Sequence, residues 1–287
     1  MSSYRITEMA RPYIEYDMIQ TYTELPDFPE FRVKLLHAVL SSHPAVSANS
    51  ELYSLVTSLV QLGMDTHDMI SNHSMDKEFK AARARQLKVL AGDYYSSRFY
   101  HLLAQSGQIE IVSRLSEAIC ETNRLKMNLY LAMKQHNLTA EQYIHQSVEI
   151  RAQLFLSFKG YAQEILGDRW PDLLNRFTLL ELLLDEISRS ETLKEVGGSW
   201  GFWHVLERCT NDEKKLLQEG ELDDAKLKNL WHKYKVTFEL YQLLAQQSKE
   251  LRADLAALGS DKLARELLII CEPVQRYLET PKVSEEI

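Results

Sequence analysis

Apolar residues recur at intervals of three and four along most of the chain, which is the spacing of one face of an α-helix. Between Ser47 and Ile70, for example, Leu52, Leu55 and Leu59 share such a face, and Ser47 is suited to begin a helix. No stretch of comparable length alternates between apolar and polar residues as a strand would. The pattern predicts an all-α protein.

Helices are expected wherever this spacing persists between polar, proline-containing or glycine-containing breaks. Polar loops are expected at 71–80 and at 197–201. The pattern predicts a bundle of about eight to ten helices, because ordinary helices run to roughly 10–20 residues. The expected organisation is a partly helical segment at 1–30, one all-α domain at 31–279 and a frayed tail at 280–287. The predicted helical segments are 31–40, 47–70, 81–103, 108–129, 139–167, 171–189, 202–217, 222–258 and 261–278.

A helical hairpin is the clearest local prediction. The segment 81–103 ends at Gln105-Ser106-Gly107, where Gly107 suits a left-handed helix cap, and a second helix follows at once. Such a short connection favours antiparallel neighbours. Gly92 lies inside the first of these helices, where glycine costs about 1 kcal/mol relative to alanine, so we expect another helix to approach it closely.

Composition supports the helical prediction and excludes some functions. The 287 residues include only 10 Gly and 7 Pro, few for a protein of short strands and turns. The formal charge of -8 argues against a general nucleic-acid binder. The cysteines, Cys120, Cys209 and Cys271, lie far apart and without metal-binding spacing, so we expect reduced, mostly buried thiols and a cytoplasmic protein. No apolar run approaches the roughly 18 residues that span a bilayer.

An acidic pair at the end of segment 47–70 is the first candidate for chemistry. Asp65 and Asp68 are three residues apart, so their carboxylates share a helical face. Two such groups can hold Mg²⁺, which prefers hard oxygen ligands, whereas His67 between them is a poor ligand for that ion. The alternative is a solvated, charged helix end without a ligand.

The sequence VLAGDYYSSRFYHLL, at 89–103, makes this region recognisable. A helix with an acidic end, a polar loop and a following helix with the letters LAGDY resemble the trans-polyprenyl diphosphate synthases. Residues 50–165 resemble more specifically the small, non-catalytic subunits of two-component heptaprenyl diphosphate synthases. The resemblance implies the all-α fold of the trans-isoprenyl diphosphate synthases, a bundle around a central cavity.

The resemblance also shows where the first metal-binding motif has changed. Catalytic members have DDxxD, whose first and last aspartates hold Mg²⁺ on the allylic diphosphate. The matching residues here run from Met64 to Asp68, and a Met64 thioether cannot replace a hard oxygen at Mg²⁺. The degenerate first motif is therefore Met64, Asp65, His67 and Asp68.

Four further elements differ from the catalytic pattern. The diphosphate-binding Arg-Arg-Gly falls near 73–75, which is His-Ser-Met, and the Gly-Lys-x-x-Arg-Pro element has no counterpart at 37–44. The Lys-Thr pair corresponds to Ile150-Arg151. The second DDxxD falls at 185–189, leaving Asp185 and Glu186 as a degenerate motif with Arg189 in the last aspartate position. The resemblance therefore implies that this chain has no catalytic residues and holds no metal or cofactor.

The family's helix with LAGD and the helix after it form the dimer interface, so the resemblance implies an interface on 81–103 and 108–129. The implied partner is the larger catalytic subunit, component 2, which would carry Mg²⁺ and act on the prenyl diphosphate. Together they would make a heptaprenyl or similar all-trans diphosphate for the menaquinone side chain, with membrane contact at product release left open. The expected interface residues are Leu87, Leu90, Ala91, Gly92, Tyr94, Tyr95, Phe99, Leu102, Ile111, Leu115, Ile119 and Thr122.

Two other functions stay open on the sequence. The chain could be an autonomous Mg²⁺-dependent prenyltransferase or terpene synthase of the same fold, in which Asp65, Asp68 and Asp185 would bind the metal. It could also be a helical scaffold unrelated to isoprenoids. The basic residues Arg83, Arg85 and Lys88 are expected on a solvated face. The aromatic group at 200–204 is expected to pack in the core or against a partner.

Overall fold

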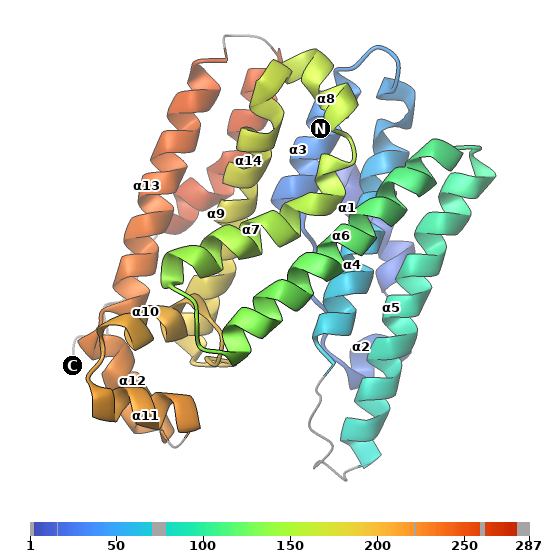
Figure 1. Cartoon of the computed structure of the whole chain (residues 1–287). Helices are drawn as coiled ribbons and strands as arrows, with labels where there is room; N and C mark the ends of the chain where they lie inside the picture. Colours follow the sequence, from blue (N-terminus) through green and yellow to red (C-terminus); the bar gives the residue numbers. More distant parts are fainter. Residues whose placement is uncertain (1–2, 16, 71–78, 221, 259–261, 280–287) are drawn as a thin grey trace. The chain divides into compact units, whose positions relative to one another are not determined.

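The computed structural model describes residues 3–15, 17–70, 79–220, 222–258 and 262–279. Within these ranges the chain forms fourteen α-helices and two 3₁₀ helices, with no strand (Figure 1). The all-α prediction is thereby confirmed. The chain folds into two compact units, Met1–Cys120 with Gln153–Leu174 and Glu121–Ala152 with Asn175–Ile287. The expected single domain at 31–279 stays a prediction.

The first unit is built on the N-terminal half of the chain. Its core lies where α4 packs against α1, α3 and α5. The start of α6, the end of α7 and the start of α9 also belong to it. The helices of this unit are α1 (Ser3–Ile14), α2 (Asp17–Tyr22), α3 (Glu30–Ser41), η1 (Ser47–Asn49), α4 (Ser50–Asp68), α5 (Phe79–Gln105), α6 (Ile109–Lys134), α7 (Ala140–Leu156), α8 (Lys159–Leu166), η2 (Gly167–Arg169) and α9 (Trp170–Thr192).

The second unit contains the rest of α6, α7 and α9 together with all later helices. In it α13 packs against α14, α10 and α12. The aromatic group at 200–204 is buried in α10, which confirms the expected core packing of Trp200, Phe202 and Trp203. The later helices are α10 (Trp200–Arg208), α11 (Asn211–Glu219), α12 (Asp224–Lys233), α13 (Val236–Ala256) and α14 (Lys262–Glu279).

Three predicted helical segments are divided in the structure, so the predicted number of helices was too low. Segment 202–217 divides at Thr210, whose hydroxyl accepts the Glu213 amide while the Glu213 carboxylate accepts the Thr210 amide. This capping box starts a new helix. Segment 222–258 divides at Lys235, which adopts a left-handed backbone with a φ of 52°. Helical periodicity continues across both breaks, so spacing alone did not reveal them.

Other expectations agree with the structure to within a few residues. Part of the N-terminal segment is helical, as expected, in α1 and α2. Segment 139–167 is helical as expected, although it divides at 157–158 into α7 and α8. The expected loop at 197–201 ends early, because Ser199 caps α10 by accepting the Phe202 amide. Most of the expected loop at 71–80 and the tail at 280–287 lie outside the described residues.

The helices α4 and α5 pack closely against each other in the first unit. A side chain on Gly63 would lie 2.8 Å from the Ser96 hydroxyl oxygen and 3.1 Å from the Gly92 carbonyl oxygen. The apolar residues beside it, Leu62, Ala91 and Tyr95, form a buried cluster. The expected close approach of another helix to Gly92 is therefore confirmed, because the backbones of α4 and α5 touch at these two glycines.

The connection between α5 and α6 has the predicted form. Gly107 has a φ of 68°, and the amide of Gln108 donates to the Leu103 carbonyl at 2.9 Å. This bond closes the helix end in the way a left-handed glycine cap allows. The cysteines are less buried than expected: Cys271 is buried, but Cys209 is half-buried and Cys120 exposed, all as free thiols.

Replacing Gly63 by alanine should lower the free energy of unfolding by ~1–3 kcal/mol, because the new methyl group meets a backbone carbonyl that cannot move aside. Thermal and urea denaturation would measure this loss. The control is Gly160→Ala in α8, where the added carbon finds nothing nearer than Arg114 Nη1 at 4.0 Å. That variant should be neutral or more stable by up to about 1 kcal/mol. Equal effects of the two changes would contradict the close contact.

Candidate functional site

The degenerate first motif lies at the C-terminal end of α4, in the first unit. Met64 is buried, with 7% of its surface exposed, and the Asp65 carboxylate is half-buried. Both Asp65 oxygens accept the Gln61 side-chain amide, at 2.8 and 2.9 Å. The Gln61 oxygen in turn accepts Arg32 Nη1 at 3.2 Å. The Asp65 carboxylate is thus tied into a chain of hydrogen bonds within the unit.

His67 and the LAGD sequence meet on the α4–α5 contact. Three His67 ring atoms lie within 2.8 Å of the place where a Gly92 side chain would begin, so glycine makes room for the imidazole. The ring nitrogen Nε2 lies 3.4 Å from Asp93 Oδ1. Asp68 is exposed at the helix end. Gly92 and Asp93 therefore serve helix packing and local polar contacts.

Arg83, Arg85 and Lys88, expected on a solvated face, are half-buried and therefore only partly in contact with solvent. Arg83 stacks on the Tyr22 ring, with its guanidinium carbon 4.4 Å from the ring centroid. Lys88 Nζ donates to the Met69 carbonyl at 3.1 Å. A lysine in this position stabilises the end of α4, where helix carbonyls lack partners.

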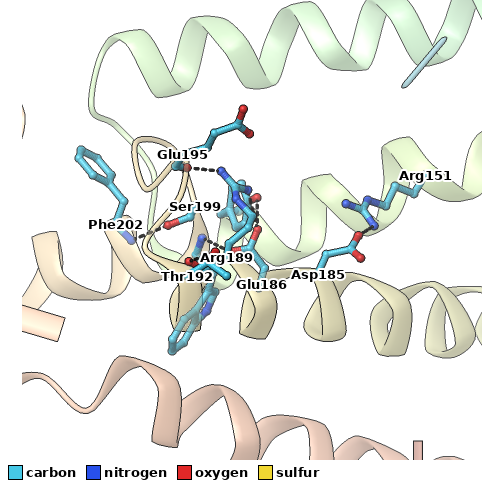
Figure 2. Close-up of polar contacts among 10 residues, drawn as sticks. Arg151, Asp185, Glu186, Arg189, Thr192, Glu195, Ser199 and Phe202 are labelled. Carbon is cyan, nitrogen blue, oxygen red and sulfur yellow. Dashed lines mark hydrogen bonds and ion pairs between the residues drawn. The ribbon is translucent and has the colours of Figure 1, made fainter. Parts of the chain in front are cut away.

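The degenerate second motif lies near the C-terminal end of α9, in the second unit. Glu186 is 2% exposed, yet three donors surround its carboxylate (Figure 2). Oε1 accepts the Tyr143 hydroxyl at 2.7 Å and Arg189 Nη1 at 2.9 Å. Oε2 accepts the backbone amide of Trp200 at 2.7 Å. A buried carboxylate with three donors and a guanidinium partner is satisfied.

Burial and the charge of Glu186 both act on the pKa values of the neighbouring Tyr143 and Arg189 side chains. Burial, followed by the negative charge of Glu186, raises the pKa of the Tyr143 hydroxyl well above its usual value. Burial disfavours the charged form of Arg189, but the combined attraction of Glu186, Tyr143 and Glu195 outweighs it and raises the guanidinium pKa. Arg189 Nη2 also donates to the Glu195 carbonyl at 2.6 Å. Arg189 therefore stays charged, and its guanidinium is held between the Glu186 carboxylate and the Glu195 carbonyl.

Asp185 is held by a second guanidinium. Arg151 Nη1 lies 2.5 Å from Asp185 Oδ2, and these side chains are 30% and 44% exposed (Figure 2). Arg151 occupies the position that the resemblance aligns with a diphosphate-binding threonine. Each carboxylate of this motif therefore already has an arginine of the same chain as its cation.

A metal centre does not emerge from the described residues. Within the ranges that the structure covers, no group of three or more histidine, cysteine or acidic side chains is arranged to hold a metal ion. No helix in the described part of the chain is long and apolar enough to cross a bilayer. The motif aligned at 73–75 lies outside the described residues.

The predicted interface residues divide into two groups. Ala91 and Tyr95 pack with Leu62 in the core of the first unit, and Leu102 packs on the cluster of Ala10, Leu55 and Leu59. These positions belong to the chain's own core, because the apolar face of α5 turns toward α4. Gly92, Phe99, Ile111, Leu115 and Thr122 are also buried, and Leu87, Tyr94 and Ile119 are half-buried.

Leu90 differs from the other predicted interface residues, since 63% of its surface is exposed. The same two helices also expose large apolar side chains that the prediction omitted. The interface stays a prediction, and these exposed residues are the ones a partner could reach. They are Val89 and Tyr100 on α5, and Ile109, Met127, Tyr130 and Leu131 on α6.

Comparison with known proteins identifies the family. Residues 16–235 match the family described as "Heptaprenyl diphosphate synthase (HEPPP synthase) subunit 1". The chain belongs to this family. It is also 36% identical over 92 residues to "Heptaprenyl diphosphate synthase component 1" of Geobacillus stearothermophilus. That match spans 32% of this chain and 40% of the relative's length.

Solved structures of other proteins have the same fold as this chain. Geranylgeranyl pyrophosphate synthase from Lactobacillus brevis has a TM-score of 0.72 at 14% identity, with 96% of this chain and 95% of that chain covered. Octaprenyl pyrophosphate synthase from Helicobacter pylori has a TM-score of 0.63 at 16% identity, covering 94% and 97%. At these identities the likeness shows the fold, which is that of the trans-isoprenyl diphosphate synthases.

The groups of the same chain that hydrogen-bond to the two degenerate motifs were not predicted from the sequence. Gln61 lies four residues before Asp65, a helical spacing that could have suggested the contact. Tyr143 lies 43 residues from Glu186, and the Trp200 donor is a backbone amide. No sequence pattern signals contacts of these two kinds.

Replacing Glu186 by alanine should lower the free energy of unfolding by ~3 kcal/mol, because the change leaves Arg189 and two further donors without their buried acceptor. Asp185→Ala is the control, since it breaks a half-exposed pair and should cost under ~1 kcal/mol. Thermal denaturation of both variants measures the difference. A loss from Asp185→Ala as large as that from Glu186→Ala would contradict the assigned role of Glu186.

Proposed function

We propose that this chain is a non-catalytic accessory subunit of a two-component heptaprenyl diphosphate synthase. The observation that carries the proposal is the pairing of the second acidic motif with arginines of the same chain. Arg189 binds Glu186 and Arg151 binds Asp185. In a catalytic site such carboxylates would instead face Mg²⁺ and its diphosphate.

The first motif supports the same proposal by a different route. Met64 is packed in the core, and both Asp65 oxygens accept the Gln61 amide. A metal ion at Asp65 would have to compete with this amide and would find no second hard oxygen at Met64. Under this proposal both motifs stabilise the fold, and an autonomous Mg²⁺-dependent enzyme is disfavoured.

The partner in this proposal is the larger catalytic subunit, component 2. The words "subunit 1" and "component 1" in the names of the family and the relative imply a second component. That partner would bring both Asp-rich motifs, Mg²⁺ and the prenyl diphosphate chemistry. The metal would offset the charge of the departing diphosphate. The product would be a long all-trans chain, for the menaquinone side chain, made in the cytoplasm.

The proposed contact surface is the exposed apolar part of α5 and α6. Leu90 and Tyr100 are 63% and 58% exposed on α5, and Ile109 is 64% exposed at the start of α6. Large apolar side chains that a fold leaves in solvent mark a protein contact where they gather on one surface. Aromatic and aliphatic residues of this kind dominate the energetics of protein interfaces. Through this surface the chain would complete the synthase and help to set the product length.

Activity measurements test the proposal directly. With allylic and homoallylic diphosphates and Mg²⁺, we expect no product from this chain alone and long-chain product when the Asp-rich component is added. Met64→Asp should not restore activity to the isolated chain, because the arginine pairs at Asp185 and Glu186 remain. Product analysis by mass spectrometry gives the chain length. Turnover by the isolated wild-type chain would overturn the proposal.

A charge placed on the contact surface should weaken the complex. We expect the double change Leu90→Glu and Tyr100→Glu to reduce affinity for the catalytic component by at least about a hundredfold, since two apolar anchors are lost and charge is buried. Ile269→Glu on α14 is the control, because Ile269 is likewise 57% exposed but lies in the other unit. Size-exclusion chromatography with light scattering measures complex formation. Equal binding by all three proteins would exclude this surface.

A further inference from the structure

The second unit contains a pocket that no part of the proposed function uses. Its volume is about 630 Å³, and it lies between the end of α9, the helix α12 and the first turn of α13. Figure 1 shows the start of α13 beside the short helix α12. The left-handed backbone of Lys235, at a φ of 52°, makes the abrupt connection between these two helices. The volume is in the range of small-molecule sites.

Two lysines, Lys228 and Lys235, outnumber the one acidic residue, Glu191, in the lining of the pocket, and His232 adds ring nitrogens. Lys228 and His232 lie one helical turn apart on α12, and Lys235 follows at the start of α13. Among the described residues, the structure records no ion pair or side-chain hydrogen bond for these three. The acidic residue in the lining, Glu191, already accepts the Tyr241 hydroxyl at 2.6 Å. The charge of the pocket therefore suits an anion.

The start of α13 adds to this preference. Lys235 is the N-cap residue of a 21-residue helix, yet its side chain makes no capping hydrogen bond. The Thr237 hydroxyl in the first turn is paired with the Ser190 hydroxyl at 2.6 Å, so it does not cap the helix either. The first amides of α13 and the positive end of its dipole thus favour a negative group beside Lys235.

The remaining walls of the pocket are apolar and aromatic. Trp231 is 4% exposed, and its indole N–H is buried without an acceptor among the described residues. Leu193 lies on the other wall. Phe238 is 55% exposed although it is a large aromatic residue on a well-formed helix. A ligand with an apolar body would cover the Phe238 ring and so remove it from water.

We propose that this pocket binds a small phosphate monoester with an apolar body. The phosphate would lie between Lys228, His232 and Lys235, where ammonium groups act as point charges for phosphate oxygens. The apolar body would lie against Trp231 and Phe238. The ligand is a soluble molecule rather than a membrane lipid, because the pocket is a local hollow of drug-like size.

Calorimetric titration of the full-length chain with n-hexyl phosphate tests the proposal. We expect saturable binding that weakens as salt is added, because the contacts with the phosphate are exposed to solvent. Inorganic phosphate, which lacks the apolar body, and hexyl glucoside, which lacks the charge, should each bind at least about tenfold more weakly. Equal binding of hexyl phosphate and hexyl glucoside would overturn the proposal. Binding to phosphatidic acid vesicles without binding of hexyl phosphate would do so as well.

Matched variants locate the site. The double change Lys228→Ala and Lys235→Ala should weaken hexyl phosphate binding about tenfold or more. The control, Lys215→Ala with Lys249→Ala, removes the same charge outside the pocket and should leave the affinity for hexyl phosphate unchanged. Phe238→Ser should weaken binding, and Ile269→Ser should not. Far-ultraviolet circular dichroism verifies the fold of each variant. If the Lys228 and Lys235 pair loses no more affinity than the control pair, the ligand does not bind in this pocket.

Discussion

The buried carboxylate of Glu186 is the constraint on which much of the second unit depends. A negative charge almost without solvent is tolerated only where donors replace the lost water. Here the donors come from three helices: the Tyr143 hydroxyl from α7, Arg189 from the next turn of α9 and the Trp200 amide from the start of α10. Because each donor must reach the same carboxylate, the three helices have to lie close together around Glu186. The Trp200 amide, at the first residue of α10, also fixes the end of the loop that precedes this helix.

The same contacts make the acidic residues at 185–186 part of the chain's own packing. Arg189 and Arg151 supply fixed positive charges to Glu186 and Asp185 from within the chain. In the first unit the change is of another kind, since Met64 joins the apolar core and a neutral amide occupies Asp65. In both units, groups at positions that the resemblance aligns with metal-binding motifs make internal contacts, and both proposals therefore concern other surfaces.

Much of the fold and the location of both motifs could be predicted from the sequence. The regular spacing of apolar residues predicted the helices, and Gly107 predicted the turn between α5 and α6, because these features depend on neighbours along the chain. The breaks at Thr210 and Lys235 were missed, since apolar spacing continues through them. The face of α5 was assigned to a partner, but Ala91 and Tyr95 pack on Leu62 within the chain. Periodicity shows that a face is apolar and does not identify what covers it.

The sequence by itself determined the all-α class, the resemblance to small synthase subunits and the absence of a hard oxygen ligand at Met64. These conclusions follow from residue types and local spacing. Tertiary structure decided that Glu186 is buried, that Tyr143 and the Trp200 amide are its partners, and that Leu90 faces solvent. It also brought Lys228, Lys235 and Glu191 to one pocket. The reason is physical: burial and long-range pairing depend on which helices meet, and a one-dimensional pattern does not carry that information.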